Sequence, residues 1–285
     1  MGWGYNRGRM ETTMKYIMTI VLACAFVVAG GCGERKNIIL TGYWPPTNEM
    51  IRPFSADPGL NPGGWKGENY KGLGYDVYAY FPTFEGGTAA NPKGDGDFQV
   101  DYQKTYEDFY RVTGKLRPVA IISYGLGDGP WEVETKAINL SEWVDDYLEP
   151  KRPGVVPAVG SVDADEAIPT SLPAAAIAEA VNRECAGVNA WVDTEGDPGG
   201  FLCNYMCLLG SDYALRYANE GVAAGFIHVG KDVSVEEATK ANEVTLDTVI
   251  ENIKKADAKS TASRRRKALL IRRLREQAMQ ARYRR

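Results

Sequence analysis

Residues 221–230 read GVAAGFIHVG, and this stretch says most about the fold. It is apolar almost throughout and bounded by glycines, as is typical of a strand that is buried on both faces. Three further runs have the same character: NIILTGY (37–43), YDVYAYF (75–81) and PVAIISYG (118–125). Strands that are continuously apolar, without alternation, indicate a mainly parallel sheet covered by helices.

Helical patterns lie between and after these strands. In 235–255 the apolar residues recur at offsets of three, four and seven, which is the helical period. The predicted helices cover 100–112, 172–183, 201–218 and 235–255. Stretches rich in Gly, Pro and Asn predict long surface loops at 44–74 and 82–99, and a loop or lid at 153–170. The sequence therefore predicts an α/β fold with three layers, α/β/α, around a mainly parallel central sheet.

The N-terminal segment 14–32 has the pattern of an export signal. A lysine precedes an apolar run at 16–28, and small residues then precede Cys32. The run is shorter than the roughly 20 residues that cross a bilayer. Small residues before a cysteine resemble the bacterial lipoprotein signal, in which that cysteine is lipidated; an ordinary signal peptide or a short helical anchor is the alternative. We expect export, with a lipid on Cys32 as the membrane anchor.

Composition divides the chain into an upstream extension with its signal (1–32), one domain (33–258) and a basic tail (259–285). From Lys259 onward eleven Lys or Arg stand against one acid, whereas the rest of the chain has 22 basic and 36 acidic residues. Leucines in the tail suit an amphipathic helix on anionic lipid or a nucleic-acid patch, and its polar composition equally suits a disordered, solvated tail. An exported protein rarely meets nucleic acid, so we expect no such partner.

The domain contains three cysteines, Cys185, Cys203 and Cys207. An odd number in an exported protein leaves one thiol free or paired between molecules. Cys185 and Cys207 are able to pair in an oxidising compartment, although their spacing alone does not establish the bond. We expect Cys203 to be the free thiol.

Cys203 and His228, the only histidine of the chain, form a candidate catalytic pair. Cysteine attacks as the thiolate, which is favoured at a helix N-terminus and beside an imidazolium. Asp197 as cap and Pro198 in the first helical position predict a helix that begins just before Cys203. His228 ends a buried strand, where the sites of α/β proteins gather. Taken alone, each residue also suits a structural place in the core.

Segments spread over residues 37 to 255 resemble the pyroglutamyl peptidase I (pyrrolidone-carboxylate peptidase) family. GGFLCNY, which contains Cys203, resembles the AGxYxCN segment of the family's nucleophile, and GFIHVG, which contains His228, resembles its FIHVP segment. Three other segments are similar in the same order: IILTGY to the strand that ends in TGF, FQVDYQKTYEDF to the PVDY segment, and VETKAIN to the ERxAIN segment.

This resemblance implies the site residues. Cys203 is the implied nucleophile, His228 takes the thiol proton and later gives it to the leaving amine, and Glu134 orients the imidazolium. Backbone N–H groups at the start of the Cys203 helix are the implied oxyanion donors. The alternative for Glu134 is a solvated surface carboxylate beside Lys136.

The residues that would hold a pyroglutamyl ring depart from the family's pattern. Tyr43 replaces the phenylalanine of TGF, Trp44 follows it, and Pro46 stands where a second phenylalanine is expected. Leu126 replaces the glutamine of the GQAGGR loop, and Val144 replaces a basic residue implicated in oxyanion binding. We interpret Tyr43, Trp44, Pro46 and Leu126 as substrate-binding residues of an altered pocket.

Two functions are compatible with these patterns. The first is a cysteine peptidase or amidase that releases a pyroglutamyl-like or other small N-terminal acyl group through a thioester on Cys203. The second is a catalytically inactive surface lipoprotein of the same fold that binds a ligand. We expect a peptide or small amide as substrate, and neither a cofactor nor a metal. The sequence does not determine the oligomeric state.

Overall fold

The computed structural model describes residues 35–147, 163–196 and 198–283. The candidate lipid-attachment residue Cys32 and the rest of the export segment lie outside the described residues, as does Asp197. In the described ranges no helix is long and apolar enough to span a bilayer.

The central sheet of the described chain has six strands in the order β2-β1-β5-β10-β6-β9. The four predicted strands are neighbours in it and run parallel to one another. β6 is antiparallel to β10, and β9 is parallel to β6. The bounds are β1 (Lys36–Gly42), β2 (Tyr75–Tyr80), β5 (Ala120–Gly127), β10 (Ala223–Gly230), β6 (Trp131–Glu134) and β9 (Ala190–Asp193). Two short two-stranded sheets pair β3 (Pro82–Thr83) with β4 (Asp95–Gly96), and β7 (Lys136–Ile138) with β8 (Ala167–Pro169).

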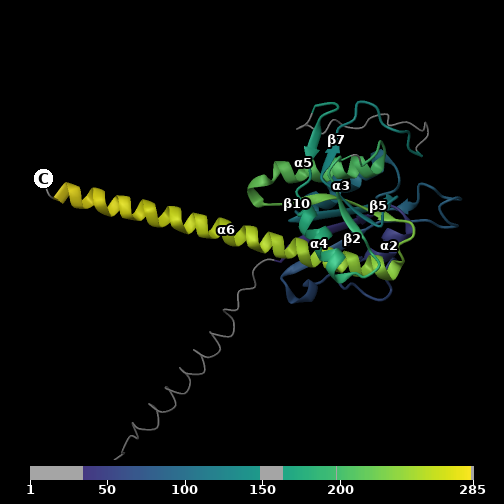
Figure 1. The fold of residues 1–285 in the computed structure, drawn as a ribbon, viewed down its shortest axis with the longest axis horizontal. Coiled ribbons are helices and arrows are strands. Elements are labelled where there is room, and N and C mark those ends of the chain that lie inside the picture. The colour runs from purple at the N-terminus through teal and green to yellow at the C-terminus, as the bar shows by residue number, and fades with distance from the viewer. Residues whose placement is uncertain (1–34, 148–162, 197, 284–285) are drawn as a thin grey trace, which may run out of the picture. The chain divides into compact units, whose positions relative to one another are not determined.

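Helices cover both faces of the sheet, which confirms the predicted α/β class with three layers (Figure 1). On one face lie α2 (Pro45–Ile51), α4 (Ala174–Glu184) and the first part of α6 (Val235–Tyr283); on the other lie α3 (Tyr102–Leu116) and α5 (Leu202–Arg216). In β1, Ile38 and Leu40 belong to the first core, and Ile39 between them belongs to the second. Both sides of the strand are buried, so its sequence is apolar without alternation.

The loop prediction for 44–74 is wrong in part. Pro45 and Pro46 open α2, and 3-10 turns follow at Arg52–Phe54 and Tyr70–Gly72. Proline suits the first helical position because its missing N–H is not needed there, so a proline-rich stretch is compatible with a helix start. The prediction for 82–99 is closer, since its only regular elements are two-residue strands.

Cys185 and Cys207 do not form a disulfide. Both are free thiols, and they lie in the two different cores, Cys185 at the end of α4 and Cys207 within α5. The sheet separates them, so a bond would require the domain to rearrange.

The helix α6 continues beyond the predicted end at residue 255 and runs to Tyr283. The last buried side chain on it is Ile253, and every described side chain from Lys254 to Arg272 is exposed. The change of composition at Lys259 therefore falls inside a continuous helix.

Candidate active site

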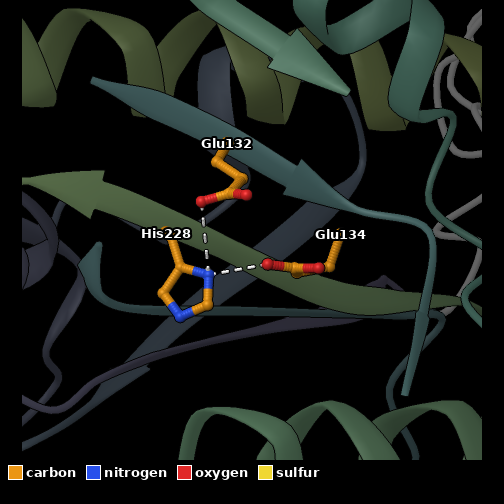
Figure 2. A group of neighbouring side chains, drawn as sticks. All are labelled: Glu132, Glu134 and His228. Carbon is orange, nitrogen blue, oxygen red and sulfur yellow. Dashed lines mark hydrogen bonds and ion pairs between the residues drawn. The ribbon is translucent and has the colours of Figure 1, made fainter. Parts of the chain in front are cut away.

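A histidine and two carboxylates meet on one face of the sheet where β10 pairs with β6 (Figure 2). His228 lies directly opposite Glu132 in the antiparallel register. Because side chains alternate along a strand, Glu134 lies on the same face as Glu132. His228 Nδ1 is 2.7 Å from Oε1 of Glu134 and 3.8 Å from Oε2 of Glu132. Glu134 is fully buried, so the surface-carboxylate alternative for it is wrong.

Cys203 lies in the first turn of α5, which begins at Leu202 with Phe201 as its N-cap. This start agrees to within one residue with the predicted helix 201–218, although Pro198 lies before the helix and not in its first position. Asn204 fixes this turn, because its fully buried amide accepts a hydrogen bond from the Ile138 N–H and donates one to the Ile138 carbonyl, each at 2.9 Å. The nucleophile candidate is thus tied to β7, which follows Glu134 in the chain.

The thiol of Cys203 lies beside the imidazole of His228 and helps to raise the pKa of that ring. Since Nδ1 faces the carboxylates, Nε2 is the ring nitrogen left for the thiol. Gly125 of β5 makes room for this contact, because a Cβ there would lie 3.0 Å from Cys203 Sγ and 2.7 Å from the Phe226 ring. Cys203, His228 and Glu134 therefore form one continuous chain of contacts.

The protonation of this chain follows from its burial and its partners. Burial by itself lowers the pKa of His228, but the hydrogen bonds to Cys203 and Glu134 outweigh it and raise that pKa to about 10. Burial raises the pKa of Glu134 to about 7, against the opposing effect of His228. Burial also raises the pKa of Glu132. The imidazole is consequently held in the protonated form that a thiolate partner requires.

The start of α5 offers backbone donors beside Cys203. Among the described residues no side chain caps this end of the helix, which leaves N–H groups of its first turn for a ligand. The segment before it is held by the hydrogen bond from the Val144 N–H to the Gly200 carbonyl, 2.9 Å. Val144 is 57% exposed and apolar, so it adds no positive charge to an oxyanion site.

Two cavities adjoin the Cys203–His228 pair. The first, here the apolar cavity, has a volume of about 720 Å³, and its wall includes Tyr43, Trp44, Pro46, Phe84, Leu126 and Cys203. The second, here the acidic cavity, has a volume of about 520 Å³, and its wall includes Leu126, Asp128, Glu132, Trp191, Gly199 and His228. All four residues interpreted from the sequence as substrate-binding thus lie around one cavity with the thiol. Leu126 borders both cavities.

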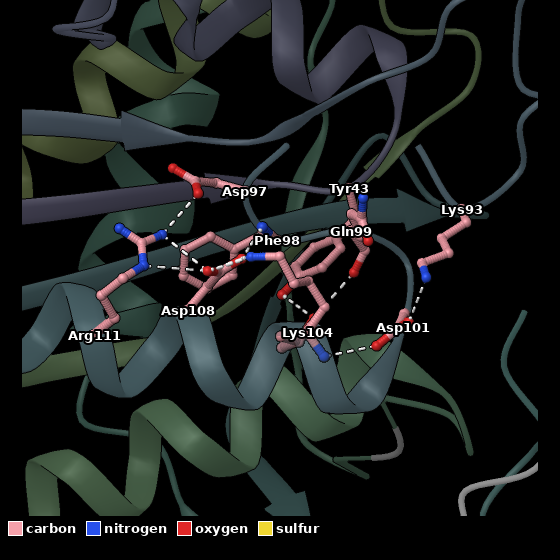
Figure 3. A network of polar contacts seen from close by, with 10 residues as sticks. Tyr43, Lys93, Asp97, Phe98, Gln99, Asp101, Lys104, Asp108 and Arg111 are labelled. Atoms are coloured by element: carbon pink, nitrogen blue, oxygen red, sulfur yellow. Dashed lines mark hydrogen bonds and ion pairs between the residues drawn. The ribbon is translucent and has the colours of Figure 1, made fainter. Parts of the chain in front are cut away.

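One wall of the apolar cavity rests on a charged network at the start of α3 (Figure 3). Phe98 packs edge-on against Tyr43, with ring centroids 6.4 Å apart, and has a φ of 52°, which is uncommon for a non-glycine residue. The Phe98 N–H donates to buried Asp108 at 2.8 Å, and Lys104 and Arg111 also bind this carboxylate. Burial tends to raise the pKa of Asp108, but these hydrogen bonds outweigh it and lower that pKa.

Glu132, Glu134 and His228 also have donor atoms within 4.8 Å of one another, a spacing compatible with a metal ion. The His228 Nδ1 and Glu134 Oε1 atoms already bind each other at 2.7 Å, so a metal would have to compete with that hydrogen bond.

Sequence reasoning missed Glu132 and gave no role to Asn204 or Asp108. The signal for Glu132 was the alternation WEVE at 131–134, which places two carboxylates on one face of any strand. For Asn204 no local pattern identifies the partner, because it is contributed by β7. Asp108 has Lys104 and Arg111 at helical spacing, but its third partner, the Phe98 N–H, comes from the chain before α3.

Comparison with known proteins shows a fold relationship without a close sequence relative. No protein-family model matches the chain, and no curated protein matches it. The chain is similar to the structure of pyrrolidone carboxyl peptidase from Pyrococcus furiosus, with 17% identity, a TM-score of 0.54, and coverage of 76% of this chain and 99% of that one. It is similar to pyroglutamyl peptidase I from Bacillus amyloliquefaciens, with 20% identity, a TM-score of 0.53, and coverage of 76% and 97%.

A third similar structure is the pyrrolidone carboxyl peptidase from Thermococcus litoralis, with 19% identity, a TM-score of 0.53, and coverage of 78% of this chain and 96% of that one. At these identities the likeness establishes the fold, and function remains to be argued from the site. The chain therefore has an α/β fold of the pyroglutamyl-peptidase type.

Proposed function

We propose that this protein is a cysteine peptidase or amidase that releases an N-terminal acyl group, pyroglutamyl-like or other, through a thioester on Cys203. The observation that supports it best is the contact chain from Cys203 through His228 to the buried Glu134. A protein that only binds a ligand has no need of a thiol, an imidazole and a buried carboxylate in this order. The inactive binder is the competing function that the experiment below addresses.

In the proposed reaction His228 already holds the proton from Cys203, and the thiolate sulfur attacks the acyl carbon, so that the bond from carbon to sulfur forms as the carbonyl π electrons move to oxygen. The oxyanion is stabilised by backbone N–H groups at the start of α5. His228 then gives its proton to the amine as the bond from carbon to nitrogen breaks. Water hydrolyses the thioester, which releases the carboxylic acid and restores the thiol. Glu134 accepts the hydrogen bond from Nδ1 and keeps the ring in position throughout.

The test compares Cys203→Ala, His228→Ala and Glu134→Gln with the wild type on a panel of N-acyl amides under reducing conditions. We expect the first two variants to lose nearly all hydrolysis and the third to keep a residue of it, because groups that act as a unit fail together. Cys207→Ala is the matched control, since this thiol lies one helical turn further along α5 and is fully buried. A His228→Ala variant with wild-type rates rules the mechanism out, because the chain has no second histidine.

Stoichiometric labelling separates the enzyme from the binder. A reactive Cys203 without turnover of any amide on the panel supports the inactive ligand-binding lipoprotein. We also propose that the protein acts at a bacterial membrane through lipid on Cys32, which rests on the sequence pattern alone. Cys32→Ser is expected to block processing, and a mature protein without lipid by mass spectrometry would contradict the anchor.

A further inference from the structure

The chemistry of acyl transfer assigns the two cavities to the two halves of the substrate. The acyl group becomes bonded to sulfur, so it has to occupy the cavity that Cys203 lines, which is the apolar cavity. The leaving amine receives its proton from His228, so it departs on the side that His228 lines, which is the acidic cavity. This assignment of the two cavities rests on the proposed function.

The wall of the apolar cavity indicates what acyl group it holds. Among the described residues that line it, none is an aspartate, glutamate, lysine or arginine. Aromatic rings, prolines and Leu126 dominate it, and Leu126 is 51% exposed. The Tyr43 hydroxyl is already committed to Thr105 at 3.4 Å, and burial raises its pKa. A lactam ring, with its N–H and carbonyl, would find few partners on such a wall.

The size of the cavity points in the same direction. Its volume of about 720 Å³ falls in the range of roughly 300–1,000 Å³ that suits drug-sized ligands, and a single lactam ring would leave most of it empty. An apolar chain that extends from the thioester fills this space and removes apolar surface from water on both sides.

We propose that the substrate is an amide whose acyl group is long and apolar, either an aliphatic chain of medium length or an arylalkanoyl group, held in the apolar cavity with its carbonyl carbon at Cys203. Each methylene that enters the cavity is expected to raise kcat/KM by about threefold to tenfold until the cavity is full. Leu126 is the specificity-determining residue at the border with the leaving-group side.

The test uses the purified full-length protein and aminomethylcoumarin amides that differ only in the acyl group: acetyl, butanoyl, hexanoyl, octanoyl, decanoyl, phenylpropanoyl and pyroglutamyl. We expect kcat/KM to rise over at least 100-fold from acetyl to an optimum at hexanoyl or longer. Comparison of the aliphatic acyl groups with phenylpropanoyl shows whether the cavity prefers an aliphatic chain or an aromatic ring. Pyroglutamyl as the best substrate, or no dependence on chain length, overturns the inference and leaves the cysteine mechanism standing.

A cavity-filling variant localises the effect. Ala89 and Ala90 are both exposed, but only Ala89 lines the apolar cavity, so Ala89→Trp and Ala90→Trp form a matched pair. We expect Ala89→Trp to move the optimum to a shorter chain, and Ala90→Trp to retain the wild-type profile. The same optimum in both variants contradicts the assignment of this cavity to the acyl group.

A second readout does not depend on turnover. Alkyl chloromethyl ketones carry the acyl chain on the carbonyl and alkylate the thiol directly, and Cys203→Ala is their control. Labelling that accelerates with chain length supports the acyl cavity even where no amide is cleaved, an outcome that defeats the hydrolytic function alone. Labelling at one rate for all chain lengths overturns the inference.

Discussion

The two cavities that meet at Leu126 differ in charge and in the way they are built. Among the described residues, the apolar cavity is lined mainly by aromatic rings and prolines, together with the thiol of Cys203. The acidic cavity carries Asp128 and Glu132 beside His228, and the indole of Trp191 lines it with 42% of the residue exposed. The proposed nucleophile, Cys203, and the proposed proton donor, His228, therefore lie in different surroundings on the two sides of Leu126. In this molecule the two halves of an amide would be selected by separate surfaces.

The difference between the two cavities should affect the protonation of His228 most, because both of its carboxylate partners, Glu132 and Glu134, lie on β6. In Glu134→Gln the pKa of His228 is expected to fall below its wild-type value of about 10, since the hydrogen bond and charge of Glu134 raise it. The chain has one histidine, so a nitrogen-15 NMR titration gives a single imidazole to follow. If His228 has the same pKa in the wild type and in the variant, Glu134 does not influence the imidazole and only packs against it.

The same shift predicts how stability depends on pH. The folded pKa of His228, about 10, lies above the ordinary value of 6.5, so the folded state binds this proton more tightly than the unfolded state. Its contribution to the free energy of unfolding should be complete below about pH 6.5 and lost as the pH rises towards 10. Urea denaturation at several pH values measures this, and Glu134→Gln should lose less stability over the same interval.

The apolar side should be sensitive to a charge that lies behind its wall. Asp108→Asn is expected to lower the free energy of unfolding by about 1–3 kcal/mol, because it weakens the bonds to the Phe98 N–H, Lys104 and Arg111 in a buried place. Asp97→Asn is the control, since Asp97 is partly exposed and binds Arg111 only at the surface. Equal effects in urea denaturation would mean that the network does not support the wall.

Kinetic measurements test the role of the acidic cavity. Asp128 is exposed and lines the acidic cavity, so Asp128→Lys should lower kcat/KM for an amide with a cationic amine, relative to one with a neutral amine, by about threefold to tenfold. Glu220→Lys makes the same charge change in the 3-10 turn Ala218–Glu220, which follows the C-terminal end of α5, and should leave the ratio unaltered. The effect should shrink as salt is added, and a ratio that does not respond would separate the leaving group from this cavity.

The smallest effect is expected from removal of the C-terminal tail, in comparison with changes in either cavity. Truncation after Ala258 removes only exposed side chains among those described, so we expect a change in stability within about 0.5 kcal/mol and unaltered kinetics on a soluble substrate. Differential scanning calorimetry and the acyl panel check this. A truncated protein that aggregates would show that the Leu269 region packs on the domain.

The sequence was informative wherever a residue's environment repeats along the chain. Strands β1, β2, β5 and β10 were predicted because burial on both faces leaves continuous apolar runs, as Ile38 and Ile39 show. The short strands β6 and β9 were missed, since four residues with mixed polarity give no period to detect. Their absence from the prediction hid Glu132, whose place depends on the antiparallel register with His228.

Contacts between residues that are distant in the sequence set the other limit on prediction from the sequence. The resemblance placed Cys203, His228 and Glu134, and the structure brings these three together. The helix start was predicted to within one residue, but Pro198 lies before the helix, because a proline suits a turn as well as a first helical position. The network under Phe98 was invisible, since a left-handed φ at a phenylalanine is favoured only by partners that fold next to it.

Helix α6 is one element by its backbone and two by its energetics. Its buried stripe ends at Ile253, and beyond that point its described side chains are exposed, with surface contacts such as the ion pair of Asp257 with Lys36. A stretch of helix that buries no side chain opens and closes with free energies near zero. Amide hydrogens should therefore exchange slowly up to about Ile253 and rapidly past it, with no kink or break to mark the boundary. The end of the folded domain, in this sense, lies in the middle of a helix.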